Sequence, residues 1–515
     1  MLSGSLLITS CRSSDNAVDN SGENLITNGS ALIKMNLLGS EYESETISTQ
    51  ASAKHTNSYS VVKEQVSTFM AGEQPVIATL TPVSAISTQA SVNPIAAVVR
   101  NPLKGPNVKY RVIAYRTSTG AKVATSVYTI DANGNSTADN GEMMLDGDNE
   151  TVNKYDFVVL SYNSSTAPAD VTGSISTATL PSISGDNDLM YFRTNNVRVS
   201  KGDNVLNILL AHKFSQITTV IDASAVAPGT PISSIGSGIV LDNHRRNGNS
   251  IALSTGVVSF GGTPATKSVS FTPPTPTSAI WTSNPTLIAN PGISATDMST
   301  LIFPDSDAGA ITVGTKSKRN FSVNNLVVTP GIKYNLKLKF ACTADATPTW
   351  PFSMSDSGSG TRLTRTFNAP AADAGFVFDI YELDNSFNMT INGVDLATQE
   401  IQFQSGVDSY PRNIWFKSDK KQWGDPGIPQ IYSLGSSTNT TPIIRITIGP
   451  DGSVSMMGRR TISSGLEPLE LYGGTRFNTV TWKTTGSNTV DATMLVTGAT
   501  VMRGLGVGKK IIACP

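Results

Sequence analysis

Cys11 is the first residue of this sequence that could do covalent chemistry. It follows an apolar run and two small residues in Leu6-Leu7-Ile8-Thr9-Ser10-Cys11. This pattern is typical of a lipobox, whose Cys thiol accepts a diacylglycerol while the preceding peptide is removed. It predicts a lipoprotein signal peptide and lipobox over residues 1–11, a polar tether over residues 12–30, and attachment to a membrane by lipid. The alternative is an unrelated Cys in a polar N-terminal segment, because residues 1–5 hold no basic residue and the apolar run is short.

The other two cysteines, Cys342 and Cys514, could form a disulfide in an exported protein. Cys342 follows a predicted strand over Lys333–Phe340, and Cys514 follows the apolar segment Ile511-Ile512-Ala513. The terminal strands of a sandwich often run side by side, which would bring the two Cα atoms within the roughly 4.4–6.8 Å that a bridge requires. The alternative is a pair of separate buried thiols that behave as small apolar residues.

A third group of candidate residues lies around a predicted hairpin, Phe376–Leu396, with the sequence FVFDIYELDNSFNMTINGVDL. Asp384-Asn385 stands at its turn, where hard oxygen ligands suit Ca²⁺, so Asp384 is a candidate calcium ligand. The hairpin resembles the core of protective-antigen-type lectin modules, which implies that Asp384 and Asn385 bind sugar hydroxyls or Ca²⁺. Trp415 and Trp423 could offer flat faces to a sugar ring. The alternative is a plain β-turn with aromatic residues in the core.

Other kinds of chemistry have little support in the sequence. The formal net charge is −1 and the basic residues are scattered, so nucleic acid is not an expected partner. The sequence contains no run of about 18 apolar residues, so it predicts no membrane-spanning helix. The chain has three His and neither a Gly-x-Ser-x-Gly nor a His-Glu-x-x-His motif, and His212 is interpreted as a structural residue at a strand end. We therefore expect no enzyme, although a hydrolase with paired carboxylates stays open as an alternative.

The elements that must position these residues are predicted to be strands. Charged residues make up 15% of the chain, against about 25% in typical domains, and the chain holds 43 Gly and 27 Pro. Such a composition favours many short strands joined by tight turns. Val108–Arg116 alternates between two faces, and Asp131–Asn135 contains the Asn-Gly pair of a hairpin turn. Ala31–Tyr42 is the first predicted strand, with Ile33, Met35 and Leu37 on one face.

Several of these strands together resemble the fimbrillin family, the lipoprotein-derived subunits and adhesins of protease-assembled (type V) pili. The N-terminal segments that carry the resemblance are VKYRVIAYR, DANGN, GDNETVNKYDFVVLSYNS and NVLNILLAHKFSQITTVID. A further segment, VNNLVVTPGIKYNLKLKF at Val323–Phe340, resembles the closing strands of the family's C-terminal domain. The resemblance implies an all-β fold of tandem transthyretin-like β-sandwiches, over residues 31–222 and 223–342. Residues 343–515 are expected to add a third β-sandwich or jelly roll with an adhesin-like role.

The resemblance also implies a structural or adhesive function at the outer membrane or cell surface, in fimbriae where the chain assembles. The expected partners are membrane lipid through Cys11, other pilus subunits, and a glycan or host-surface ligand. In this family, removal of a first strand opens a groove that a neighbour's C-terminal segment fills, and Ala31–Tyr42 matches that strand by position. The third unit leaves no obvious donor tail, which favours a tip or accessory subunit. The alternative is a surface glycan-binding lipoprotein that does not polymerise.

Overall fold

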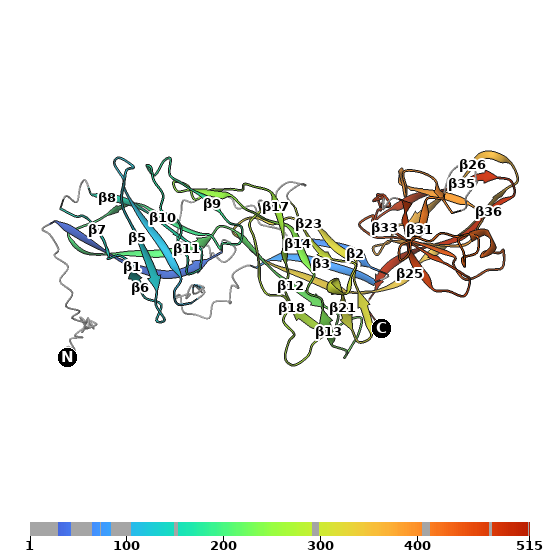
Figure 1. The fold of residues 1–515 in the computed structure, drawn as a ribbon, viewed down its shortest axis with the longest axis horizontal. Coiled ribbons are helices and arrows are strands. Elements are labelled where there is room, and N and C mark those ends of the chain that lie inside the picture. Colours follow the sequence, from blue (N-terminus) through green and yellow to red (C-terminus); the bar gives the residue numbers. More distant parts are fainter. Residues whose placement is uncertain are drawn as a thin grey trace, which may run out of the picture.

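The computed structural model describes residues 29–42, 64–72, 74–83, 103, 105–148, 153–290, 298–403, 412–472, 476–512 and 514. The fold is all-β, as expected, and its sheets form three sandwich-like units in a row (Figure 1). Within the described ranges the helical elements are two short 3-10 turns, η2 (Asp307–Gly309) and η3 (Ile431–Ser433). No helix in those ranges is long and apolar enough to cross a membrane.

The first unit contains an eight-stranded sheet with the order β6-β5-β4-β8-β10-β11-β1-β7. Its strands are β1 (Ser30–Glu41), β4 (Lys109–Arg116), β5 (Lys122–Ile130), β6 (Ser136–Ala138), β7 (Met143–Asp146), β8 (Lys154–Ser161), β10 (Met190–Arg198) and β11 (Gly202–His212). A three-stranded sheet packs on one face of this large sheet. It is made of β9 (Thr179–Ile183), β15 (Asn249–Ala252) and β16 (Val258–Ser259).

The alternation predicted for Val108–Arg116 is confirmed, and it explains why the large sheet is covered on both faces. Tyr110 and Val112 of β4 belong to one buried cluster, while Ile113 and Tyr115 belong to another, which includes residues of β9 and β15. Successive side chains of a strand point to opposite faces, so β4 contributes to two cores at once. The predicted turn at residues 131–135 joins β5 to β6.

The middle unit is built around a sheet with the order β18-β12-β24-β3-β2, to which β19 is added beside β12. Its strands are β2 (Gln65–Ala71), β3 (Gln74–Pro82), β12 (Ser215–Asp222), β18 (Ile280–Thr282), β19 (Thr286–Ile288) and β24 (Lys333–Phe340). A second layer contains β14 (Val240–Arg246), β17 (Pro264–Ser268), β20 (Ser299–Phe303) and β23 (Phe321–Leu326). A third, three-stranded sheet contains β13 (Ile232–Ile235), β21 (Ile311–Val313) and β22 (Lys316–Lys318).

This pairing differs from the expected division of the chain between residues 222 and 223. β2, β3 and β12 come from the range expected to form the first sandwich, yet they pair with β24 or with one another in the middle unit. Conversely, β15 and β16 pair with β9 of the first unit. The physical reason is that alternation identifies a strand and its buried face, whereas main-chain groups can pair with any suitable extended edge. The chain therefore passes more than once between the two units.

The third unit is a sandwich of two sheets around one large core. The seven-stranded sheet has the order β25-β36-β27-β32-β33-β34-β31, and the other has the order β26-β35-β28-β29 with β30 beside β28. The strands are β25 (Cys342–Asp356), β26 (Ser359–Pro370), β27 (Phe376–Leu383), β28 (Ser386–Ile391), β29 (Val394–Asp395), β30 (Ile401–Gln402), β31 (Ile414–Phe416), β32 (Ile444–Ile448), β33 (Val454–Arg459), β34 (Leu466–Leu471), β35 (Ser487–Thr497) and β36 (Thr500–Ile512).

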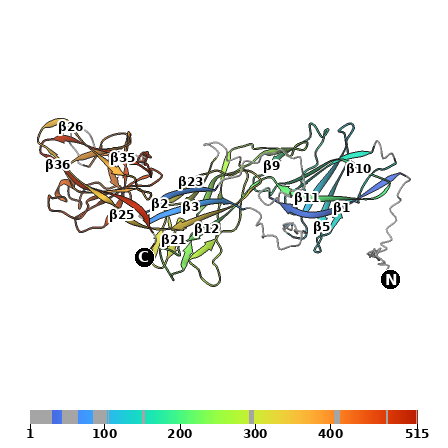
Figure 2. The ribbon, with the colours of Figure 1, turned by 180° about the vertical axis from the view of Figure 1, so that it is seen from behind.

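The middle and third units meet at a short junction, which both views of the ribbon show (Figures 1 and 2). The N–H of Ala341 donates to the carbonyl of Pro75 at 3.0 Å, so β3 holds the chain just before the third unit begins. The Nζ of Lys417 also lies 2.6 Å from Asp305 Oδ2 across the junction. These contacts attach the third unit to the middle unit beyond the covalent chain itself.

A disulfide joins Cys342 at the start of β25 to Cys514 after β36, with 5.0 Å between the two Cα atoms. The two strands are antiparallel neighbours, and Cys342 lies opposite Ile512 in their register. The bridge therefore fastens the first strand of the third unit to its last strand.

Replacing both cysteines, in the double variant Cys342→Ser and Cys514→Ser, should lower the free energy of unfolding of the third unit by up to about 5 kcal/mol. This is the chain-entropy value for a bridge whose cysteines are 172 residues apart. Four of the five tryptophans (Trp350, Trp415, Trp423 and Trp482) lie in this unit, so tryptophan fluorescence during denaturant unfolding measures the change. Hydrogen exchange in β11 of the first unit is the internal control and should not change. An unchanged fluorescence midpoint would contradict the prediction.

Candidate functional site

The position of β1 beside β11 is the first candidate site, because the sequence predicted that Ala31–Tyr42 could be exchanged for a strand of a neighbouring subunit. β1 pairs in parallel with β11, from Ala31 opposite Gly202 to Glu41 opposite Ala211. Its other edge pairs with the short β7 over Ser30–Ile33. Ala31 and Ile33 are buried, and Met35 and Leu37 pack against the same core, as the predicted face requires.

A bulge in β1 sets which residues face inward at the end of the strand. The register with β11 shifts between Leu37 and Gly39, so Leu38 is an extra residue. Gly39 has a φ of 119°, which glycine adopts without steric strain. An extra residue reverses the alternation. Ser40 and Tyr42 are consequently buried where an unbroken strand would turn both outward.

The inward-facing Ser40 and Tyr42 meet a buried polar network around His212 at the end of β11. His212 Nδ1 lies 2.7 Å from Asp188 Oδ1, and His212 Nε2 lies 3.1 Å from Ser40 Oγ. Asn163 Nδ2 donates to the other carboxylate oxygen of Asp188 at 2.9 Å. The Tyr42 ring stacks on the imidazole with 3.9 Å between the centroids. The network therefore ties the end of β1 to three other segments of the first unit.

The connectivity Ser40–His212–Asp188 is that of a nucleophilic triad, so its chemistry has to be considered. Ser40 is 2% exposed, His212 4% and Asp188 9%. A nucleophile must reach a substrate carbonyl, and burial of the whole network shields Ser40 Oγ from any such group. The arrangement instead satisfies buried polar groups and fixes β1 in place, in agreement with the structural interpretation of His212. Sequence analysis missed Ser40, Asp188 and Asn163 as its partners because they are distant in the sequence.

The variant His212→Ala should loosen β1 selectively. It removes hydrogen bonds to Ser40 and Asp188 and the stack on Tyr42, which together should cost about 2–4 kcal/mol of unfolding free energy. Hydrogen exchange of the amides of β1 should become faster than in the parent protein, as measured by mass spectrometry. His244→Ala is the matched control, because His244 is a buried histidine of the middle unit whose Nδ1 lies 2.7 Å from the carbonyl oxygen of Ala265. It should not accelerate exchange in β1; equal acceleration in both variants would rule out the selective role.

The structure places Asp384 and Asn385 at the turn between β27 and β28, as predicted, and their side chains accept hydrogen bonds from backbone amides. Asp384 Oδ2 accepts the N–H of Val501 at 2.8 Å, and buried Asn385 accepts the N–H of Ser386 at 2.6 Å. Within the described parts of the chain, no group of three or more His, Cys, Asp or Glu side chains could hold one metal ion. Ca²⁺ takes about 6–8 oxygen ligands, often from several carboxylates, and the described chain gathers no such group of acidic side chains around Asp384. The turn alternative is the better account of this pair.

One of the two predicted sugar-stacking tryptophans is placed differently from the expectation. Trp423 is 0% exposed and lies in the core of the third unit, where its Nε1 donates to the carbonyl of Arg459 at 2.9 Å. Trp423 therefore cannot present a face to a ligand. Trp415 on β31 is partly exposed, but Lys420 Nζ lies over its ring at 5.5 Å from the centroid. Trp415 Nε1 donates to Glu470 at 2.7 Å.

The predicted residues of the third unit thus do not come together. Asp384 contacts β36, whereas Trp415 lies on β31, which β32, β33 and β34 separate from β27 within the sheet. Spacing in the sequence suggested a shared site, but the order of the strands in the sheet separates the turn after β27 from β31. Cys11, the predicted lipid attachment site, lies outside the described residues.

The environment of Asp384 has a consequence for stability. Burial raises the pKa of its carboxyl above the usual 3.8, the N–H of Val501 opposes this, and the Glu382 charge raises the pKa further. Between pH 3.8 and the raised pKa, the folded chain binds more protons than the unfolded chain. The unfolding free energy therefore falls as pH rises through that window.

Asp384→Asn removes this titration while keeping an oxygen that can accept the N–H of Val501. At pH 7 the unfolding free energy of the variant should equal that of the parent protein or exceed it by up to about 1 kcal/mol. Near pH 3 this difference should disappear. Denaturant unfolding across pH 3–7 measures it. Asp373→Asn is the matched control, because exposed Asp373 accepts the N–H of Ile511 on the same strand, β36. A parent protein that gains stability relative to Asp384→Asn as pH rises would contradict the sign.

Comparisons with known proteins return solved structures at low sequence identity and low TM-score. No family model matches the sequence, and no curated protein matches it. A candidate cell adhesion protein of Bacteroides uniformis is 14% identical, with 46% of this chain and 90% of that chain covered and a TM-score of 0.31. A candidate cell adhesion protein of Bacteroides fragilis is 11% identical, with coverage of 60% and 96% and a TM-score of 0.31. A candidate polysaccharide-binding protein of Bacteroides thetaiotaomicron is 12% identical, with coverage of 42% and 72% and a TM-score of 0.24.

Proposed function

We propose that this chain is a lipid-anchored cell-surface protein of the fimbrillin type, with a structural and adhesive role as a tip or accessory subunit. The observation that carries the proposal is the contrast between its two terminal strands. β1 pairs with β11 along its length and with β7 over Ser30–Ile33, whereas β36 is paired on both sides and a disulfide holds its end.

Main-chain pairing with β11 holds β1 along its length, its apolar face packs in the core, and the buried network around His212 holds its end. In the described part of the chain, β7 covers the other edge of β1 over Ser30–Ile33 alone. Side-chain contacts beyond that point include Lys34 Nζ to Asp203 Oδ2 at 2.6 Å and Asn36 to Asn207 at 2.6 Å. Both are exposed, and exposed pairs contribute little to stability. Withdrawal of β1 would leave a groove beside β11 that an incoming strand could fill with equivalent main-chain hydrogen bonds.

β36 could not serve as the strand donated to a neighbour. It pairs with β25 on one side and with β27 on the other, and the Cys342–Cys514 disulfide fixes its end. Donation would break two ladders of main-chain hydrogen bonds and a covalent bond. A subunit that receives a strand beside β11 but keeps β36 in its own sheet would not pass β36 on to the next copy. This asymmetry supports a terminal or accessory position.

The arrangement of the units suits an anchored adhesive protein. The unit that contains β1 lies at one end of the row and the third unit at the other (Figures 1 and 2). A lipid on Cys11 would hold the N-terminal end at a membrane, so the third unit would be presented farthest from it. A second candidate function, a glycan-binding surface lipoprotein that does not polymerise, is favoured by a polar cleft beside the third unit.

The proposal predicts that Cys11→Ala releases the protein from the membrane fraction, because the Cys11 thiol is the acyl acceptor. It also predicts that the purified parent protein forms no long homopolymers, because β36 cannot be donated. Detergent fractionation and mass spectrometry of the N-terminal peptide measure acylation, and electrophoresis without heating measures polymers. The double variant Cys342→Ser and Cys514→Ser, which removes the disulfide but keeps Cys11, is the control and should leave fractionation unchanged. An exported chain with an intact Met1, or a ladder of homopolymers, would count against the proposal.

A further inference from the structure

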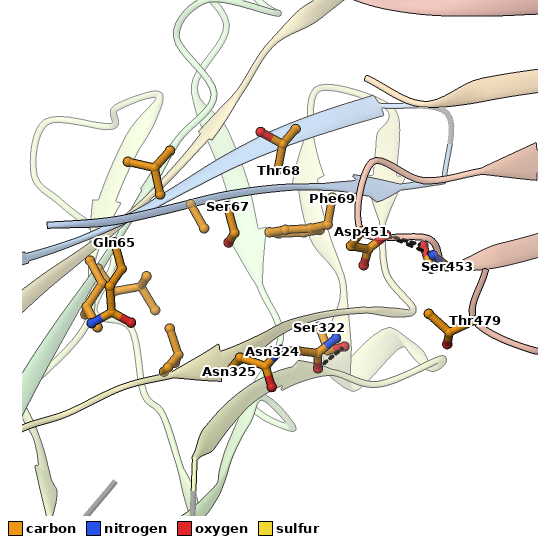
Figure 3. A pocket seen from close by; sticks show the side chains of 15 residues that line it. Gln65, Ser67, Thr68, Phe69, Ser322, Asn324, Asn325, Asp451, Ser453 and Thr479 are labelled. Atoms are coloured by element: carbon orange, nitrogen blue, oxygen red, sulfur yellow. Dashed lines mark hydrogen bonds between the residues drawn. The ribbon is translucent and has the colours of Figure 1, made fainter. Parts of the chain in front are cut away.

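A cleft of about 400 Å³ lies where the middle unit meets the third unit (Figure 3). Its walls come from three parts of the sequence: β2, β23, and the turn between β32 and β33 with the nearby Thr479. β2 and β23 are edge strands of the two layers of the middle unit. The cleft is therefore the open side of the middle sandwich, capped by the third unit. Its volume falls within the roughly 300–1,000 Å³ of small-molecule sites.

A bulge in β23 brings two amide side chains to the edge of the cleft. In the pairing with β20, Leu326 is opposite Ser299 and Val323 is opposite Leu301, so Asn324 and Asn325 share one partner position. Asn325 has a φ of 60°, a left-handed conformation that Asn tolerates better than most residues. Bulges of this kind redirect side chains at sheet edges. Figure 3 shows Asn324 and Asn325 beside Ser322 on the wall that faces Ser67 and Phe69 of β2.

The lining has the chemistry of a site for neutral, hydroxyl-rich molecules. The polar lining residues are amides and hydroxyls apart from one carboxylate, and they are Gln65, Ser67, Thr68, Ser322, Asn324, Asn325, Asp451, Ser453 and Thr479. Amides and hydroxyls both donate and accept hydrogen bonds, as sugar hydroxyls do. No Lys, Arg or His is among the lining residues within the described chain, and Asp451 would repel an anion. Apolar side chains also line the cleft, and all of them except the exposed Val66 are buried; they are Val66, Phe69, Ala78, Leu80, Leu326 and Leu336.

Both ends of the cleft are bounded, which favours a compact ligand over a peptide strand that runs through. At one end, Gln65 Nε2 donates to the carbonyl of Val327 at 2.6 Å, and Gln65 Oε1 accepts the N–H of Val327 at 3.0 Å. This amide occupies the position at which an added strand would have to pass between β2 and β23. At the other end, Asp451 Oδ1 accepts the N–H of Ser453 at 3.1 Å and its hydroxyl at 2.7 Å.

The wall that the third unit supplies is held firmly. Gly452 has a φ of 80° and sits so close to residue 480 that an added Cβ would lie 1.8 Å from the Val480 carbonyl oxygen. The N–H of Val480 donates to the carbonyl of Gly452 at 2.9 Å. Close backbone packing therefore fixes Asp451, Ser453 and Thr479 relative to one another, as a preorganised binding wall requires.

We propose that this cleft binds a neutral mono- or disaccharide through Ser67, Asn324, Asn325, Ser453 and Thr479. The ligand would contact both the middle and the third unit, so that its binding would also restrict their relative movement. The assignment of an extracellular sugar as the ligand rests on the proposed role at the cell surface. Binding by the purified protein, however, requires neither acylation nor assembly.

The test uses the purified full chain on immobilised neutral glycans that end in glucose, galactose, mannose or N-acetylglucosamine, beside sialylated and sulfated counterparts. We expect at least one neutral glycan to bind. Ser67→Trp, which fills the cleft, should weaken that binding about tenfold or more. Ser355→Trp is the matched control, since Ser355 is an exposed serine in a strand away from the cleft, and it should leave binding unchanged. Thermal unfolding establishes that both variants are folded.

A second variant addresses the amides without adding bulk. Asn324→Ala with Asn325→Gly removes both side chains and keeps a residue that adopts positive φ, so it should also weaken binding about tenfold. Failure of every neutral glycan to bind, binding of charged glycans alone, or equal binding by the parent protein and both cleft variants would each overturn the assignment. Binding of an extended peptide that displaces Gln65 would do the same. Because Cys11→Ala leaves the cleft intact, a failure of anchoring and a failure of glycan binding are separate results.

Discussion

The position of β24 between β3 and β12 is the constraint on which the rest of the structure depends. Main-chain groups of a buried strand must be paired, and β24 finds its partners at residues 76–82 on one side and 216–222 on the other. The chain must therefore enter the middle unit early, leave it to build most of the first unit, and return. Because these contacts join residues far apart in the sequence, we expect the first two units to fold slowly and together.

The sequence predicted strands and turns well, but it did not predict which strands pair with one another. Alternation identified both faces of Val108–Arg116, and the Asn-Gly pair identified the hairpin turn before β6, because both signals lie within a few residues. The partners of β2 and β3 could not be predicted, since an alternating strand fits many edges equally well. The disulfide could be predicted because the chain has few cysteines. The terminal strands of a sandwich also often lie side by side, so few pairings had to be considered.

The candidate sites show the same limit for a different physical reason. Trp423 was expected at a surface because aromatic residues suit sugar rings, but the same apolar area is equally suited to a core, and the core is where it lies. Asp384 and Trp415 are near in sequence, but Asp384 lies in the turn after β27 and Trp415 lies on β31 at the far edge of the seven-stranded sheet. The cleft combines residues from 65 to 479, and its amides depend on a bulge that leaves no clear pattern in the sequence. His212 was assigned a structural role correctly, yet its partners required the structure.

The disulfide also determines how the third unit would respond to mechanical force. Tension between a membrane anchor and a ligand held by the third unit would enter that unit at Cys342. β25 is an edge strand, and an edge strand alone can be peeled from a sheet one hydrogen bond at a time. The bridge passes part of the load to the end of β36, an interior strand flanked by β25 and β27. Rupture then requires ladders on both sides of β36 to fail together, so the lifetime of the attachment under load depends on the unfolding rate of this strand rather than on equilibrium stability.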